Sequence, residues 1–164
     1  MPNHHLSGFK MQQQWPQTNW CWAAVTASTA KFYNQATPWT MCRLAEYLLQ
    51  SAKCCAHPEK CDRTFATGEA LKRIGRLEQQ TDKAEDWATC DREITAERPL
   101  GVRIEWESNR PGHAVMIVGI ETATDERVTV ADPDWDERTM SWDELASNYQ
   151  GTKGRWVRSW FTKK

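Results

Sequence analysis

The first half of the chain carries hydrophobic residues at helical spacing. Residues 20–33 place Trp22, Val25 and Phe32 on one stripe, which predicts an amphipathic helix. Asn19 stands directly before this segment, and an asparagine side chain commonly accepts a hydrogen bond from the first turn of a helix. We therefore expect Asn19 to cap a helix over residues 20–33.

Further helices are expected before the middle of the chain. Residues 38–52 have an apolar face that consists of Met41, Leu44, Leu48 and Leu49. Residues 53–62 break the periodicity and predict a loop. Thr67 is expected to cap a third helix, whose apolar residues are Leu71, Ile74 and Leu77. Residues 89–99 predict only one or two more turns.

The second half of the chain has the patterns of β-strands. Residues 100–106 alternate apolar and polar positions, whereas residues 112–120 form an apolar, β-branched run that is typical of a buried strand. The remaining predicted elements are strands over 127–133 and 154–162 and a short helix over 142–149. Ser141 and Glu144 form a capping box at the start of that helix. Helices followed by an antiparallel sheet predict an α+β fold.

A chain of 164 residues is long enough for one domain with a buried core. We expect residues 1–16 to form an irregular arm and residues 17–164 a single domain. Its helical half would cover about 17–98 and its sheet half about 99–164. The net charge of −1, from 21 basic and 22 acidic residues, does not favour nucleic acid or a membrane surface as a partner. The longest apolar run is too short to span a bilayer, and we expect no signal peptide in this chain.

Six cysteines are a high number for this length, and four lie close together in the sequence: Cys42, Cys54, Cys55 and Cys61. Two disulfides among these four are the preferred interpretation, which favours secretion or delivery to another cell. Free thiols in a cytosolic protein are the second interpretation, and a zinc site that includes His57 is the third. Cys90 is left over and is expected to be buried or free.

Cys21 lies between Trp20 and Trp22 and has two interpretations. A buried cysteine at the start of a helix is the structural one, and position alone favours it. A nucleophile is the chemical one, because a thiol attacks carbonyl groups as the thiolate and the first turn of a helix favours negative charge. Trp22 is expected to pack in the core between the two halves, and Trp20 to line a cleft.

The sheet half offers a histidine and a carboxylate that could activate such a thiol. Of the four histidines, His113 opens the buried strand, where it can reach across a cleft. If residues 113–120 and 127–132 form a hairpin, Asp132 lies beside His113, because the midpoint between them falls in the polar connection. Asp134 is a competing carboxylate. The structural alternatives are a hydrogen-bonded histidine at a strand end and a turn carboxylate before a proline.

Three motifs in this order, NWCWAAV, GHAVMIVGI and VADP, resemble those of the papain-like cysteine proteases. The closer resemblance is to a compact bacterial branch that includes plant-pathogen effector proteases and is related to bacteriocin leader peptidases. CCAHPEKC and PLGVRIEW are similar to segments of that branch, so the resemblance covers about residues 12–162. It implies a papain-like fold, in which a helical half with the catalytic cysteine at a helix N-terminus packs on an antiparallel sheet.

The resemblance also implies roles for individual residues. Cys21 matches the nucleophile that forms a thioester, His113 the base, and Asp132 the residue that orients the imidazole. A glutamine upstream of the cysteine normally donates to the oxyanion. Papain spacing puts that glutamine at position 15, which is tryptophan here, so Gln17 is the preferred candidate and Gln14 the alternative.

We therefore expect a cysteine peptidase that cleaves peptide bonds with a Cys-His-Asp triad and needs no metal or organic cofactor. The expected partners are a protein or peptide substrate and a cognate inhibitor or immunity protein, and the expected role is that of a bacterial effector or toxin. An acyl-transfer enzyme on the same triad (a deamidase, transglutaminase or isopeptidase) and a catalytically idle binding module are the alternatives. Trp106 and Trp135 flank the two functional strands, where they could shape a substrate groove.

Overall fold

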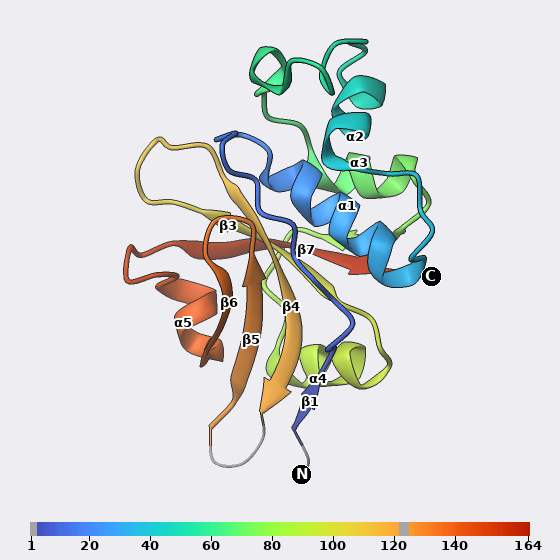
Figure 1. Ribbon diagram of the computed structural model, residues 1–164. Helices are drawn as coiled ribbons and strands as arrows, with labels where there is room; N and C mark the ends of the chain where they lie inside the picture. Colours follow the sequence, from blue (N-terminus) through green and yellow to red (C-terminus); the bar gives the residue numbers. More distant parts are fainter. Residues whose placement is uncertain (1–2, 122–124) are drawn as a thin grey trace.

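The computed structural model describes residues 3–121 and 125–164, which fold into helices packed on one sheet (Figure 1). The helical half contains α1 (Cys21–Tyr33), α2 (Met41–Leu48), the 3₁₀-helix η1 (Pro58–Cys61) and α3 (Thr67–Arg73). Two further helices are α4 (Trp87–Thr95) and α5 (Trp142–Ser147). None of the helices in the described ranges is long and apolar enough to cross a membrane.

The strands of the described residues form one antiparallel sheet in the order β2-β7-β3-β4-β5-β6, with β1 paired to β4. They are β1 (His4–His5), β2 (Leu77–Thr81), β3 (Leu100–Glu105), β4 (His113–Glu121), β5 (Arg127–Asp132), β6 (Asp136–Ser141) and β7 (Arg155–Thr162). In Figure 1, α1, α2 and α3 gather above the sheet, while α4 and α5 lie beside its lower part. The predicted α+β class is confirmed.

The helical half has a hydrophobic core of its own, distinct from the core built on the sheet. Trp20 and Trp22 are almost fully buried in it, next to Leu44 of α2. The expectation that Trp20 lines a cleft is therefore wrong, because its ring is enclosed and its Nε1 donates a hydrogen bond to the carbonyl of Cys61. Trp22 is buried as expected, but it packs with the helices and contacts the ring of Phe65.

Several elements differ from the predicted pattern. The third helix ends at Arg73, so Leu77 begins strand β2, and Thr67 opens that helix instead of capping it. A further strand, β6, follows β5. Both β2 and β6 are largely exposed strands at the ends of the sheet order, and their sequences lack the alternation that one buried face imposes. Helix α4 runs for nine residues, which is longer than the one or two turns expected.

The N-terminal segment packs against the sheet. His4 and His5 pair with β4, and Leu6 and Phe9 are buried in the sheet core. His4 Nε2 also lies 2.9 Å from a carboxylate oxygen of Glu97. The expectation of an irregular arm is therefore wrong for these residues, because buried apolar side chains and strand pairing tie the segment to the fold. The division of the chain at residue 17 stays a prediction.

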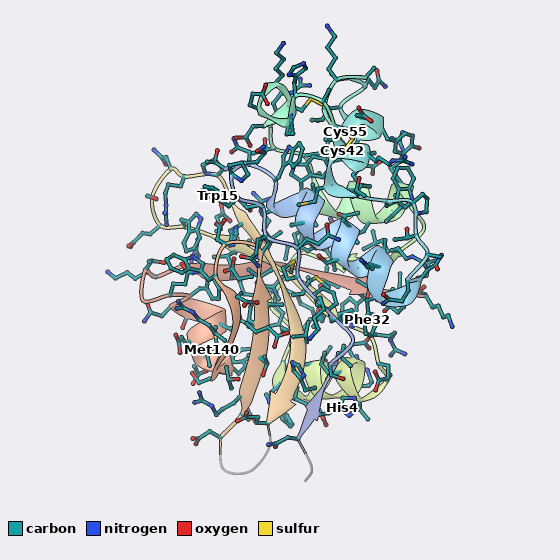
Figure 2. The ribbon with its side chains drawn as sticks, viewed as in Figure 1. His4, Trp15, Phe32, Cys42, Cys55 and Met140 are labelled. Atoms are coloured by element: carbon teal, nitrogen blue, oxygen red, sulfur yellow. A yellow bond between two sulfur atoms is a disulfide. The ribbon has the colours of Figure 1, made fainter. Side chains whose placement is uncertain are left out.

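Two disulfides connect the four clustered cysteines. Cys42 bonds Cys55, and Cys54 bonds Cys61. Figure 2 shows Cys42, which belongs to α2, and Cys55 in the helical half. The preferred interpretation is confirmed, and the free-thiol and zinc interpretations are wrong because these sulfur atoms are already bonded. Disulfides form in oxidising compartments, so they are consistent with an extracellular protein.

Candidate active site

Cys21 is the first residue of α1 and is partly exposed. The capping residue is Trp20, whose side chain accepts no hydrogen bond from the first turn. The expectation that Asn19 caps the helix is therefore wrong. The N–H groups of a first turn have no partner within the helix, and together with the helix dipole they favour negative charge. Cys21 thus lies at the end of α1 that presents these N–H groups.

Asp62 holds the segment that leads into this helix. Its carboxylate accepts hydrogen bonds from the N–H groups of Thr18 and Asn19, at 3.0 and 2.8 Å. The side-chain amide of Asn19 donates in return to the Asp62 carbonyl, at 3.1 Å. Because Cys61 is disulfide-bonded and its carbonyl binds Trp20, the Asp62 loop is itself anchored. A contact more than forty residues away in sequence therefore fixes the start of α1, which no local capping pattern predicts.

Replacing Asp62 with alanine should loosen the position of Cys21. Loss of these hydrogen bonds should lower the free energy of unfolding by about 1–2 kcal/mol. Displacement of the nucleophile should lower kcat/KM by about 10- to 100-fold. Denaturant unfolding without reductant and peptide hydrolysis measure the two effects. Asp62→Asn keeps one accepting oxygen and should fall in between, whereas full activity of Asp62→Ala would show that the contact does not position the site.

β4 and β5 bring His113 and Asp132 together. Nε2 of His113 lies 2.8 Å from Oδ1 of Asp132, and both side chains are buried. The two residues are not directly opposite each other, as the hairpin prediction had it. Met116 pairs with Ala131, so the next residue, Asp132, lies level with Val115, two positions from His113. Residues two positions apart on a strand share a face, so Asp132 still reaches the ring.

Asp132 is held by donors on both carboxylate oxygens. Besides His113, Oδ1 accepts the backbone N–H of Asp134 at 2.8 Å. Oδ2 accepts the hydroxyl of Tyr149 at 2.6 Å and the side-chain amide of Gln150 at 3.3 Å. The competing carboxylate of Asp134 lies farther from the ring, with Oδ2 4.0 Å from Nε2. Asp132 is thus the carboxylate that fixes the imidazole, and Tyr149 and Gln150 are supports that the sequence did not predict.

The electrostatics of this pair favour an imidazolium. Burial alone would lower the pKa of His113, but hydrogen bonds with Asp132 and with the side chain of Cys21 raise it from 6.5 to about 10. At Asp132, burial acts to raise the pKa, but the interaction with His113 outweighs it and lowers the pKa of that carboxyl. Because Nε2 is committed to Asp132, Nδ1 is the ring nitrogen left for Cys21. An imidazolium beside a thiol favours the thiolate.

A cavity of about 820 Å³ opens beside Cys21 and His113. Its lining includes Phe65 and Thr67 from the helical half and Trp106 from the sheet half. The ring of Trp106 stacks on that of His113, with 6.1 Å between the ring centroids. The position of Trp106 therefore fits the expectation that it shapes a substrate groove. Trp135 is exposed and is not among the residues that line this cavity.

Gln14 and Gln17 are both buried near the start of α1. The side-chain amide of Gln14 donates to the carbonyl of Thr18 at 3.0 Å, while its Oε1 has no partner within the described residues. The N–H of Gln14 donates to the carbonyl of Pro133, next to Asp132. Neither glutamine is among the residues that line the cavity of about 820 Å³. The oxyanion role of Gln17, with Gln14 as the alternative, stays a prediction.

The remaining candidates in the chain differ chemically from this group. Cys90 is a free cysteine, but it is fully buried, and burial raises the pKa of its thiol to about 12. His113, Asp132 and Asp134 have ligand atoms within 4.8 Å of one another, close enough for a metal ion. A histidine binds metal as the neutral imidazole, however, whereas here the carboxylate favours the protonated ring. The donor set fits proton transfer better than metal binding.

A helix-borne cysteine facing a buried histidine–carboxylate pair, on helices packed against an antiparallel sheet, is the arrangement of the papain-like cysteine peptidases. Comparison with protein-family models matches residues 6–158 to the Peptidase_C39 like family, and the chain belongs to that family. The comparison with curated proteins gave no match. The match supports a cysteine peptidase at the level of the family. The resemblance to effector proteases and leader peptidases stays a prediction.

Proposed function

We propose that this protein hydrolyses peptide bonds through a thioester, with Cys21 as nucleophile, His113 as acid and base, and Asp132 as the residue that orients the imidazole. One observation carries the proposal. Nε2 of His113 is bound to a buried carboxylate at 2.8 Å, while the same ring interacts with the Cys21 side chain, and both residues line a cavity. The nucleophile thus contacts the base, and the base contacts the orienting group, as covalent catalysis requires.

In the first half of the reaction, the thiolate of Cys21 attacks the scissile carbonyl carbon and forms a C–S bond. The carbonyl electrons move to oxygen, where the N–H of Cys21 and the amide of Gln17 or Gln14 would stabilise the charge. The imidazolium of His113 then gives its proton to the amide nitrogen. The C–N bond breaks, the amine leaves, and a thioester remains.

In the second half, the neutral ring of His113 removes a proton from water, whose oxygen attacks the thioester carbon. The C–S bond breaks, the acid product leaves, and the thiolate–imidazolium pair is restored. Asp132 accepts a hydrogen bond from Nε2 throughout, which holds Nδ1 toward the sulfur. The supports at Tyr149 and Gln150 keep the carboxylate fixed while the charge of the ring changes.

Proteome-wide cleavage profiling tests this function. Wild-type protein is added to a proteome with and without a small primary amine, beside Cys21→Ala, after mass spectrometry has verified that the two disulfides are intact. We expect new peptide N-termini in the wild-type sample alone. Amine attached to the acyl products would instead indicate acyl transfer by a transglutaminase-like reaction. Conversion of glutamine to glutamate would indicate a deamidase, and cleavage at lysine side chains would indicate an isopeptidase. Identical wild-type and variant profiles would contradict catalysis and favour a binding module.

The two disulfides also support a location outside the reducing cytosol. We infer that the protein is secreted or delivered to another cell, where it acts as an effector or toxin on a protein or peptide substrate. Cells that make such a peptidase commonly need protection from it, so a cognate inhibitor or immunity protein belongs to the same proposal. A protein that co-purifies with wild-type enzyme and blocks alkylation of Cys21 would support this inference.

A further inference from the structure

Arg103 is a charged residue in the cavity that the proposed reaction does not use. It lies on β3, is half-buried, and lines the same cavity as Cys21 and His113. Across residues 3–121 and 125–164, no carboxylate lies within ion-pair distance of its guanidinium and no acceptor binds it. The guanidinium has five donors in a planar fork that matches a carboxylate. It is therefore available to bind an anionic group that enters the cavity.

The neighbours of Arg103 make a purely structural role unfavourable. Its Cα partner on β7 is another arginine, Arg158, and like charges opposite each other destabilise a sheet. Arg158 has its own carboxylate, since its Nε lies 2.7 Å from Asp82. The partner on the other side is Ala114, which offers no charge. The sheet thus provides an ion pair for one arginine of the pair and leaves the other facing the cavity.

The guanidinium of Arg103 lies against Gly112, the residue before His113. A Cβ atom added at Gly112 would come within 2.7 Å of Nη2 and 2.8 Å of Cζ, so the guanidinium rests on the backbone of the residue before His113. The second arginine of the cavity, Arg110, is already engaged. Its guanidinium lies 4.4 Å from the ring centroid of Trp106, and the side chain is exposed. Arg103 is therefore the free cation next to the reacting groups within the described lining.

We propose that Arg103 binds a carboxylate of the substrate and so makes the enzyme selective for peptides that carry a carboxylate near the scissile bond. This inference rests on the proposed peptidase function. The carboxylate belongs either to an aspartate or glutamate near the scissile bond or to the C-terminus of the substrate, and a guanidinium can bind both through two parallel hydrogen bonds. Asp134, the carboxylate in the lining, would in turn disfavour substrates with further negative charge on its side of the cavity.

Paired synthetic peptides test the assignment. Each pair differs by glutamate against glutamine at one position near the scissile bond, and a second series differs by a free against an amidated C-terminus. For wild type we expect kcat/KM to be about 10- to 100-fold higher for the carboxylate form in one of the two series. The ratio should fall close to one in Arg103→Gln, and Arg103→Glu should prefer lysine at that position. Arg158→Gln removes the neighbouring charge from the same sheet and should keep the wild-type ratio.

A second measurement does not depend on peptide hydrolysis. Iodoacetate carries a carboxylate and iodoacetamide does not, and both alkylate a reactive thiol. The rate ratio of iodoacetate to iodoacetamide at Cys21 should fall several-fold in Arg103→Gln but not in Arg158→Gln, with the thermal unfolding midpoint unchanged. Equal ratios in wild type and Arg103→Gln, or a carboxylate preference that survives Arg103→Gln, would overturn the inference and leave the peptidase proposal intact. Failure of the peptidase proposal appears separately, as cleavage that survives in Cys21→Ala.

Discussion

Replacing Cys21 with alanine should lower kcat/KM for peptide hydrolysis by at least about 10⁴-fold. The expected loss is this large because the proposed reaction has no other nucleophile, so neither the thioester nor its hydrolysis can occur. The fold should survive, since the thiol is partly exposed at the first residue of α1 and alanine suits a helix. Initial rates on a quenched fluorescent peptide and circular dichroism would measure the two properties.

Cys90→Ala is the matched control, because it removes the other free thiol of the chain. In the wild-type protein the thiol of Cys90 is buried and its pKa is raised, so Cys90 should neither cleave peptides nor react with an epoxide probe at neutral pH. Wild type and Cys90→Ala should each take up one equivalent of the probe, and Cys21→Ala none. A Cys21→Ala protein that still cleaves the peptide, or a probe that labels Cys90 first, would remove the basis for Cys21 as the nucleophile.

The residues of the site whose positions depend on local sequence could be predicted from the sequence. Cys21 begins a helix whose apolar stripe is visible in the sequence, and His113 opens an apolar, β-branched run that is typical of a buried strand. The hairpin between β4 and β5 was foreseen from the polar segment that joins them. Its register was less predictable, because the pair Glu121–Arg127 beside the connection is already displaced from that of a simple hairpin, and the irregularity between Ile117 and Gly119 shifts the pairing again. The histidine and carboxylate meet because Asp132 lies diagonally across the strands on the same face.

The supports of the site depend on contacts that sequence patterns do not contain. Tyr149 ends the segment after α5, and nothing near it in sequence marks it as the donor to Asp132. Asp62 follows the disulfide-bonded Cys61, yet it holds the segment before α1 through the N–H groups of Thr18 and Asn19. In both cases a polar side chain satisfies backbone or carboxylate groups far away in the chain, which becomes visible only once the two halves are packed. The edge strands β2 and β6 were not predicted for a related reason. Their pairing with β7 and β5 defines them, and their hydrophobic pattern does not.

Removal of the Asp132 carboxylate should affect both activity and its pH dependence. In Asp132→Ala the imidazole loses its orienting acceptor, and kcat/KM should fall by about 100- to 1,000-fold. Asp132→Asn keeps an oxygen that can accept from Nε2 of His113 but carries no charge, so its loss should be smaller. Hydrogen bonding to Asp132 is the largest cause that raises the pKa of His113 to about 10. Without the charge this pKa falls, and the alkaline limb of the kcat/KM profile, where the imidazolium deprotonates, should move to lower pH.

Asp134→Asn separates this effect from a general loss of negative charge. Asp134 lies 4.0 Å from the same ring nitrogen but is partly exposed, so solvent weakens its influence and the alkaline limb should move less than in Asp132→Asn. Kinetic profiles from weakly acidic to strongly alkaline pH, together with NMR titration of the His113 ring in each variant, give the shift directly. If the limb stays in place in Asp132→Asn while activity falls, Asp132 acts only by shaping the fold. If Asp134→Asn moves the alkaline limb further than Asp132→Asn does, Asp134 and not Asp132 is the carboxylate that binds the His113 ring.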